Sequence, residues 1–255
     1  VTMILLVGNW KMAPQKSTEA LILAKKTLAT ARLYKKSVST VVCVPSIHIP
    51  FLTKALRSVV SIGGQEVSSL PHIAQTGLIS ADMLRSYGAA YCIVGHSEAR
   101  ARGESDEQVL GATVALVQKK ITPIICIGEK ERDAHGWYLS TVKSQIETII
   151  GGIPKPHLKN IVFAYEPIWA IGSGAAREAT VSECREMIMF IRKVIADAVG
   201  EKIATSIRIL YGGSVNEQNA ATFIVEGGAQ GLLVGRVSLD AKRFAALTKT
   251  IALVA

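Results

Sequence analysis

Residues 160–174 read Asn-Ile-Val-Phe-Ala-Tyr-Glu-Pro-Ile-Trp-Ala-Ile-Gly-Ser-Gly. The apolar first half predicts a β-strand over Asn160–Glu166, which places the Glu166 carboxylate at the carboxyl end of that strand. Pro167 ends the strand because proline has no backbone N–H to donate to a neighbouring strand. The apolar loop that follows ends in glycines, which is typical of a lid that covers a site for part of the time. The predicted lid comprises Pro167, Ile168, Trp169, Ala170, Ile171, Gly172, Ser173 and Gly174.

The position of Glu166 beside this lid suggests a general base, because excluding water makes a carboxylate a more effective base. The alternative is a buried structural glutamate that precedes an ordinary loop. This stretch alone leaves both interpretations open.

Seven other short apolar runs along the chain also read as strands, at Ile4–Asn9, Thr40–Pro45, Val60–Gln65, Tyr91–Gly95, Pro123–Gly128, Arg208–Gly212 and Gly231–Gly235. Helical spacing of apolar residues lies between them, for example over Ser17–Leu33, Glu107–Lys120 and Val181–Val199. Strands that are apolar on both faces and alternate with helices indicate a parallel sheet covered by helices. Eight such units in 255 residues predict an α/β fold, a single (β/α)8 barrel domain over residues 1–255. A doubly wound open sheet is less favoured, because no Gly-x-Gly-x-x-Gly motif follows the first strand.

The composition excludes a disordered chain, because 49% of the residues are hydrophobic and 19% are charged. The net charge of +9 favours an anionic ligand, but the lysines and arginines are scattered, so we expect no specific nucleic-acid binding. The four cysteines lack Cys-x-x-Cys spacing, which predicts buried free thiols and no metal site. We find neither a signal peptide nor a run long enough to cross a membrane, so we expect a cytoplasmic protein.

In barrels of this kind the reactive groups lie at the carboxyl ends of the strands. The first strand ends in Asn9-Trp10-Lys11, and the alternation of side chains lets Asn9 and Lys11 point into the barrel mouth. A lysine there offers a fixed positive charge to an anion or to a developing enolate oxygen. The alternative is an ordinary surface lysine.

The fourth strand is followed by His96-Ser97-Glu98. Ser97 reads as the N-cap of a helical turn, and the positive end of that turn disfavours a charged imidazole at His96. A neutral His96 could donate a hydrogen bond as a weak acid, and Glu98 could anchor Lys11. A capped polar turn without chemistry is the alternative.

Cys126 in the fifth strand and Glu129 at its tip are predicted to lie around the site without contacting a ligand. We expect Glu129 to hold neighbouring loops together. The loops after the seventh and eighth strands carry Tyr211-Gly212-Gly213-Ser214 and Gly235-Arg236. Such paired loops on the last two strands form the recurrent phosphate site of this architecture.

Four motifs resemble the triosephosphate isomerase family: Asn-Trp-Lys-Met at 9–12, Gly-His-Ser-Glu at 95–98, residues 165–174, and Tyr-Gly-Gly-Ser-Val-Asn at 211–216. The resemblance covers nearly the whole chain. It implies a TIM barrel that interconverts dihydroxyacetone phosphate and D-glyceraldehyde 3-phosphate, in glycolysis and gluconeogenesis, without a cofactor or metal and as a homodimer.

The resemblance also implies roles for individual residues. Glu166 would move a proton between carbons, His96 would polarise the carbonyl, and Lys11 would stabilise the enediolate. The implied substrate-binding residues are Asn9, Lys11, Gly172, Ser173, Ser214, Gly235 and, through its N–H, Arg236.

The sequence departs from the family pattern in several places. In the third loop the residue types at five positions differ from those usual in the family: Glu66, Ile73, Ala74, Gln75 and Leu78. Ala13 also replaces an asparagine, and Ala99 replaces an arginine. After the lid, residues 175–181 contain two extra residues and lack the usual proline. Two alternatives therefore stay open: an isomerase of a four-carbon ketose phosphate, and a non-catalytic phosphosugar-binding protein.

Overall fold

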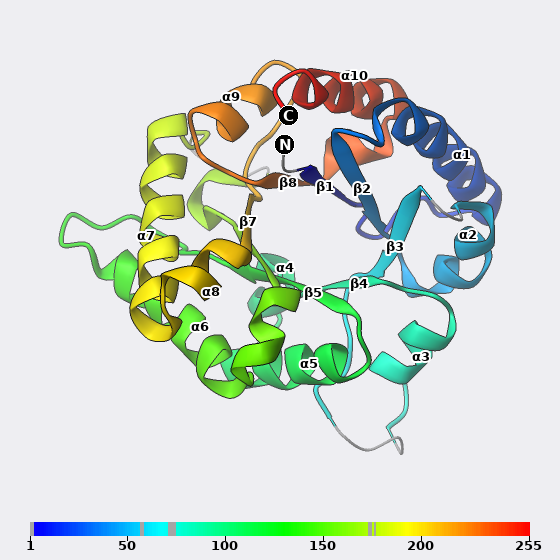
Figure 1. Cartoon of the computed structure of the whole chain (residues 1–255). Helices are drawn as coiled ribbons and strands as arrows, with labels where there is room; N and C mark the ends of the chain where they lie inside the picture. The colour runs from blue at the N-terminus through cyan, green and yellow to red at the C-terminus, as the bar shows by residue number, and fades with distance from the viewer. Residues whose placement is uncertain (1–2, 57–58, 71–74, 173–174, 176) are drawn as a thin grey trace.

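A computed structural model describes residues 3–56, 59–70, 75–172, 175 and 177–255. Over these residues eight parallel strands form one closed barrel, in which each strand pairs with the next in sequence and β8 pairs with β1 (Figure 1). The strands are β1 (Ile4–Asn9), β2 (Val38–Cys43), β3 (Val60–Gly64), β4 (Tyr91–Val94), β5 (Thr122–Ile127), β6 (Val162–Tyr165), β7 (Arg208–Tyr211) and β8 (Gly231–Val234). The predicted (β/α)8 barrel is confirmed, and the open sheet is excluded.

Helices surround the barrel and cover the outer face of the strands (Figure 1). They are α1 (Ser17–Tyr34), α2 (Ile49–Leu56), α3 (Ala81–Ser86), α4 (Ser97–Ala101), α5 (Asp106–Gln118), α6 (Trp137–Gly152), α7 (Val181–Val199), α8 (Glu201–Ser206), α9 (Ala220–Val225) and α10 (Ala241–Ala252). Short 3-10 helices are η1 (Ser46–His48), η2 (Lys155–Asn160), η3 (Ile168–Ala170) and η4 (Arg236–Leu239). Within the described ranges, every helix is too short or too polar to cross a membrane.

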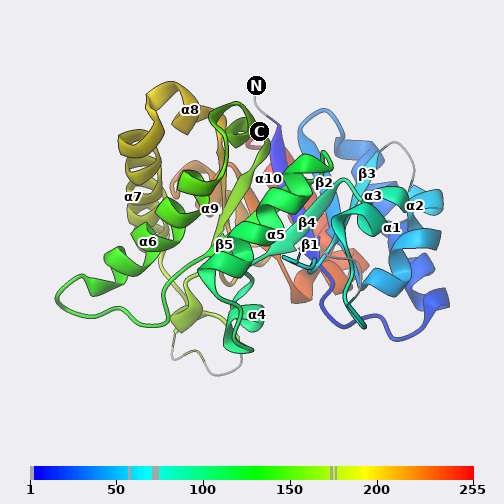
Figure 2. The same ribbon diagram turned by 90° about the horizontal axis from the view of Figure 1, so that it is seen from below.

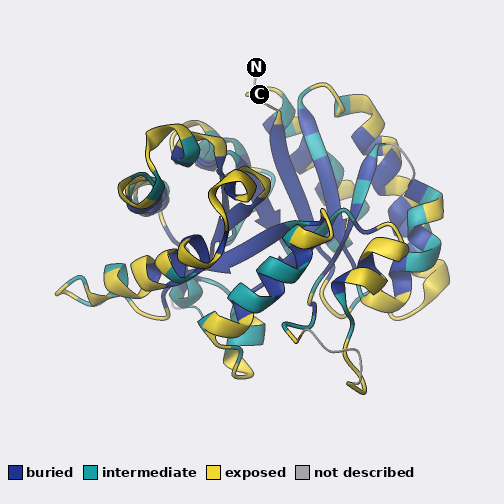
Figure 3. Ribbon diagram, turned by 60° about the horizontal axis from the view of Figure 1, so that its bottom comes forward, coloured by how far each residue is buried: buried dark blue, intermediate teal, exposed yellow. Residues whose placement is uncertain are grey.

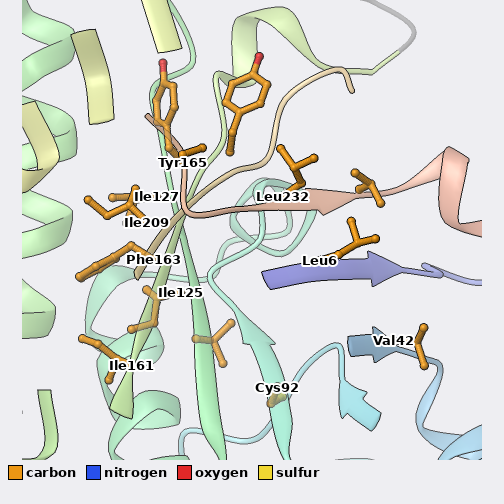
Figure 4. Packing of buried hydrophobic residues seen from close by; sticks show 14 of the residues in the cluster. Leu6, Val42, Cys92, Ile125, Ile127, Ile161, Phe163, Tyr165, Ile209 and Leu232 are labelled. Carbon is orange, nitrogen blue, oxygen red and sulfur yellow. The ribbon is translucent and has the colours of Figure 1, made fainter. Parts of the chain in front are cut away.

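Alternation along the strands divides the buried apolar residues into two clusters. Leu5 and Val7 belong to a cluster formed by strand residues inside the barrel, whereas Leu6 belongs to a larger cluster between the strands and the helices. Figure 4 shows part of this outer cluster, in which Phe163 of β6 lies near Ile125 of β5. The strands are almost wholly buried, and the helices expose their outer faces (Figure 3).

The predicted strands differ from the observed ones mainly at their ends. The sequence predicts Glu166 and Gly212 within strands, but each lies one residue beyond the end of its strand. Each still makes one backbone hydrogen bond to the neighbouring strand. The Glu166 N–H donates to Ile127 O at 2.8 Å, and the Gly212 N–H donates to Tyr165 O at 2.8 Å. β2 begins two residues earlier than predicted because Val38 pairs with Ile4 at the start of β1. The tip residues are therefore fixed by the sheet although they lie outside it.

The two ends of the barrel differ in what they carry. The start of β1 and the C-terminus lie at one end, and α4 lies at the other, beside the carboxyl ends of the strands (Figure 2). This second end is where the sequence places its candidate site.

Candidate active site

A cavity of about 760 Å³ opens at the carboxyl ends of the strands. The sequence-predicted residues that line it are Asn9, Lys11, His96, Glu98, Glu166, Ile168, Ile171, Gly172, Ser214, Gly235 and Arg236. Ser173 and Gly174, predicted as part of the lid, lie outside the described residues. The fold thus brings together residues from five different strand ends.

Glu166 is buried at the tip of β6 and faces His96 at the tip of β4. One carboxylate oxygen, Oε2, accepts the Ser97 N–H at 2.9 Å. The other, Oε1, lies 3.1 Å from His96 Nε2. A backbone donor thus fixes the carboxylate and leaves its second oxygen directed at the imidazole.

The side chain of His96, rather than that of Ser97, caps α4. His96 Nδ1 accepts the Glu98 N–H at 3.2 Å, so the prediction that Ser97 is the N-cap is wrong. The reason is that Ser97 already lies within the helix and its N–H is bound to Glu166. Because Nδ1 acts as an acceptor, we assign the proton of a neutral His96 ring to Nε2, the nitrogen that faces Glu166.

Lys11 adopts a left-handed backbone conformation, with φ of +51°. Residues other than glycine rarely adopt this conformation, which costs roughly 1–3 kcal/mol and persists where surrounding contacts impose it. Here the Lys11 N–H donates to Asn9 Oδ1 at 2.9 Å, and Gln65 Nε2 donates to Lys11 O at 2.9 Å. These contacts direct the Lys11 side chain into the cavity.

The Lys11 ammonium donates to Glu98 Oε1 at 2.6 Å. Partial burial alone would raise the pKa of Glu98, but the hydrogen bond and charge of Lys11 outweigh this effect and lower it. Glu98 therefore remains ionised and holds the ammonium beside the cavity, as the sequence predicts.

The opposite side of the cavity is built by the loops after β7 and β8. Ser214 Oγ donates to Ala170 O at 3.3 Å, and Asn219 Nδ2 donates to Ser214 O at 3.2 Å. Ser238 Oγ donates to Gly235 O at 2.6 Å and so fixes the second loop. A Cβ atom added at Gly235 would lie 3.5 Å from the Lys11 Cε, which shows how close this loop comes to the lysine.

Cys126 and Glu129 lie behind the cavity. Cys126 belongs to the cluster inside the barrel, where burial and then the Glu166 charge raise the pKa of its thiol, so it stays neutral. Glu129 is buried, and its Oε1 accepts the Tyr165 O–H at 2.8 Å and the Trp169 Nε1–H at 2.7 Å. Glu129 therefore joins β6 to the predicted lid.

The sequence reasoning missed several residues around the cavity. Arg100 Nε donates to Gly95 O at 2.8 Å, and its Nη1 donates to Asp106 at 2.6 Å. These bonds support the turn at Gly95, whose φ of +68° favours glycine. Arg243 lines the cavity itself and is paired with Glu217 at 2.7 Å. Arg243 could have been predicted from the sequence, because it lies in the first turn of α10, the helix that follows the β8 loop.

A family model described as triosephosphate isomerase matches residues 4–251 of the chain. The triosephosphate isomerase of Moorella thermoacetica is 38% identical over 249 residues, which cover 95% of this chain and 96% of the relative. That of Leifsonia xyli subsp. xyli is 38% identical over 252 residues, which cover 96% of each chain. That of Methylococcus capsulatus is 37% identical over 250 residues, which cover 97% of this chain and 98% of the relative. The chain therefore belongs to the triosephosphate isomerase family, a family of aldose–ketose isomerases.

Proposed function

We propose that the chain interconverts dihydroxyacetone phosphate and D-glyceraldehyde 3-phosphate, a step of glycolysis and gluconeogenesis. The observation that carries this proposal is the convergence of Glu166, His96 and Lys11 on one cavity, with Glu166 Oε1 at 3.1 Å from His96 Nε2. A base, a hydrogen-bond donor and a fixed cation are the groups that proton transfer next to a carbonyl requires.

In this mechanism Glu166 removes a proton from the carbon next to the carbonyl and returns it to the adjacent carbon. The His96 Nε2–H donates to the carbonyl oxygen and then moves protons between the two oxygens of the enediolate. Because Nε2 faces Glu166 in this structure, the substrate exchanges that contact for its own oxygens when it enters. The Lys11 ammonium stabilises the negative charge that develops on the enediolate oxygen.

The phosphate group fits the side of the cavity formed by the loops after β7 and β8. The Ser214 hydroxyl and the N–H groups of Gly235 and Arg236 would hold it there, and Gly172 and Ser173 would join them when the lid closes. The Arg236 side chain is exposed at the cavity wall, so it can stay clear of a phosphate bound to the backbone. The net charge of +9 also attracts a dianionic substrate.

The direct test is the isomerisation rate of the purified protein with D-glyceraldehyde 3-phosphate, compared with that of Glu166→Gln. We expect fast turnover that falls by orders of magnitude in the variant, because an amide cannot accept the proton. Rates on four-carbon ketose phosphates belong in the same experiment. A strong preference for those substrates, or phosphate binding without turnover, would refute the proposal.

We also propose that the chain forms a homodimer. Large apolar side chains are exposed near the third loop, including Ile47, Met83 and Tyr87, and they line an apolar cleft of about 200 Å³. A second copy of the chain would cover this surface, as the family resemblance implies, although the third loop itself departs from the family pattern. Sedimentation velocity at micromolar concentration tests this proposal, and a purely monomeric protein would contradict it.

A further inference from the structure

The two loops proposed to hold the phosphate group follow β7 and β8, and these two strands are joined by the shortest pairing in the barrel. Among the described residues, β7 pairs with β8 at one position, Tyr211 with Leu232. By contrast, β7 pairs with β6 at four positions, and β8 pairs with β1 at four. Gln230 also bonds to Ile209, but this contact lies at the start of β8, away from the cavity. At the cavity end the sheet therefore contributes little to the spacing of the two loops.

The loop after β7 is attached to β6, because the Gly212 N–H is bound to the last residue of that strand. Asn216 and Asn219 then close the loop on itself: each donates its N–H to the side-chain oxygen of the other, at 2.8 and 3.0 Å. Asn219 Nδ2 also donates to Ser214 O at 3.2 Å. Glu217 lies between the two asparagines, so its position is tied to that of Ser214.

The loop after β8 is attached to β1 instead. Ser238 Oγ lies 2.6 Å from Gly235 O and 3.3 Å from Asn9 O, at the end of β1. The loop leads through η4 into α10, whose first turn is capped by Asp240. The Asp240 carboxylate accepts the Arg243 N–H at 3.1 Å. The backbone of Arg243 is therefore tied to the loop that carries Gly235.

An ion pair between Glu217 and Arg243 joins these two loops. Arg243 Nε donates to Glu217 Oε1 at 2.7 Å, and Arg243 Nη2 donates to Glu217 Oε2 at 3.0 Å. Two parallel hydrogen bonds of this kind define an orientation as well as a distance. The Glu217 side chain is only 18% exposed. The hydrogen bonds from Arg243 lower the pKa of Glu217, so the pair stays ionised at neutral pH.

We propose that Glu217 and Arg243 are positioning residues that hold the Ser214 loop and the Gly235 loop at the spacing at which both contact one phosphate group. This inference rests on the proposed function in requiring that a phosphorylated ligand binds between these loops. The ion pair supplies, at the cavity end, a connection that the single paired position of β7 and β8 does not.

Arg243 also lines the cavity, so its charge could act on the phosphate directly. The two roles predict opposite signs for Glu217→Gln. If charge alone mattered, removing the Glu217 carboxylate would leave a free guanidinium beside the cavity and strengthen phosphate binding. If position matters, the same change breaks the connection between the loops and weakens binding. Arg243→Gln weakens binding in either case, so Glu217→Gln is the variant that decides.

The size of the effect is bounded by the strength of the pair. Loss of a partly exposed ion pair changes an equilibrium by at most about 5-fold, which is equivalent to about 1 kcal/mol. The measured dissociation constant rises as the fraction of molecules with the correct loop spacing falls. We therefore expect Glu217→Gln to bind phosphorylated ligands about 2- to 5-fold more weakly than the wild type. Arg243→Gln should lose at least as much, because it leaves the Glu217 charge unpaired.

The test measures the dissociation constants of inorganic phosphate and 2-phosphoglycolate by isothermal titration calorimetry with the full chain. Arg243→Lys keeps a cation but not the fork of N–H donors, so its affinity should fall between those of Arg243→Gln and the wild type. Lys193→Gln is the matched control. Lys193 is paired with Asp197 at 2.8 Å within α7, outside the residues that line the cavity, and its loss should leave both dissociation constants unchanged.

Steady-state kinetics provide a readout that a merely structural role would not move. A contact made equally well in the bound substrate and in the transition state changes KM and leaves kcat unchanged. In Glu217→Gln the KM for D-glyceraldehyde 3-phosphate should therefore rise about 2- to 5-fold, while kcat stays within about 2-fold of the wild type. The double variant Glu217→Gln/Arg243→Gln should bind no more weakly than Arg243→Gln alone, because the pair is already broken.

The outcomes separate this inference from the proposed function. A wild type that turns over no sugar phosphate, but whose phosphate binding is weakened by both single variants, would refute the function and retain the positioning role. Unchanged or tighter binding by Glu217→Gln, or additive losses in the double variant, would overturn the positioning role even in an active enzyme. Failure of the wild type to bind either probe would overturn both.

Discussion

Gly128 lies so close to the backbone of Glu166 that no larger residue fits at this position. A Cβ atom added at Gly128 would overlap the backbone carbonyl oxygen of Glu166 and approach its carbonyl carbon to 2.8 Å. Neither backbone can move away easily. The Glu166 N–H donates to Ile127 O. Gln145 Oε1 accepts the Gly128 N–H at 2.9 Å, and Gln145 Nε2 donates to Gly128 O at 3.2 Å. Gly128→Ala must therefore push the Glu166 backbone outward.

The magnitude follows from this displacement. Relief of the overlap moves the carbonyl by about 1 Å, and a misplacement of that size costs on the order of 100-fold in rate. A catalytic carboxylate needs to be held within about 0.5 Å of its productive position. We therefore expect kcat to fall about 100-fold, equivalent to about 2.7 kcal/mol of activation free energy. Overpacking at the same site should also lower the free energy of unfolding by about 1–3 kcal/mol.

The assay is steady-state turnover of D-glyceraldehyde 3-phosphate, with circular dichroism to verify that the barrel is retained. Gly151→Ala is the matched control: a Cβ there meets nothing within 4 Å, and Gly151 lies in α6, where alanine is the better helix former. The control should keep full activity. Wild-type kcat in Gly128→Ala would refute the claim that this close approach positions the base.

Three further predictions concern single charges. Lys11→Met should lower kcat/KM by at least about 100-fold with an unchanged thermal midpoint, because it removes a cation from the cavity rather than from the core; equal activity would exclude Lys11 from the reaction. Glu129→Gln should lower the free energy of unfolding by about 1–3 kcal/mol in denaturant titrations, because the charged acceptor shared by Tyr165 and Trp169 is lost. The hydrogen bonds from Arg177 lower the pKa of Glu183 from 4.5 to about 2, so this carboxylate stabilises the fold above pH 4.5 and the contribution is lost as the pH falls towards 2. The stability difference between the wild type and Arg177→Ala should accordingly shrink over that range, and a difference independent of pH would contradict the assignment.

The sequence predicts the barrel and the location of the site well, because both depend on short-range patterns. Apolar runs of strand length mark the strands, and the rule that chemistry follows strand ends places Lys11, His96 and Glu166 around one opening. The pattern could not identify His96 as the cap of α4, because Ser97 is the better cap by residue type and the choice depends on where the ring turns. It could not find the contacts of Trp169 with Arg132 and Arg177 either. Arg132, Trp169 and Arg177 come from separate loops, and only the folded chain brings them together.

The tip of β5 fixes the backbone of Glu166 and of the first residues of the predicted lid. Ile127 O accepts the Glu166 N–H, and Glu129 O accepts the Ile168 N–H at 3.0 Å, so residues 166–168 continue the pairing of β6 with β5 beyond the end of the ladder. Gly128 lies between these two bonds and permits the close approach of the two chains. The backbone of Glu166 is therefore fixed by the barrel, whereas Trp169 is held by side-chain contacts with Glu129, Arg132 and Arg177. Contacts of that kind can be broken and remade without disturbing the sheet. In the proposed mechanism this division lets the predicted lid close while the Glu166 backbone stays in place.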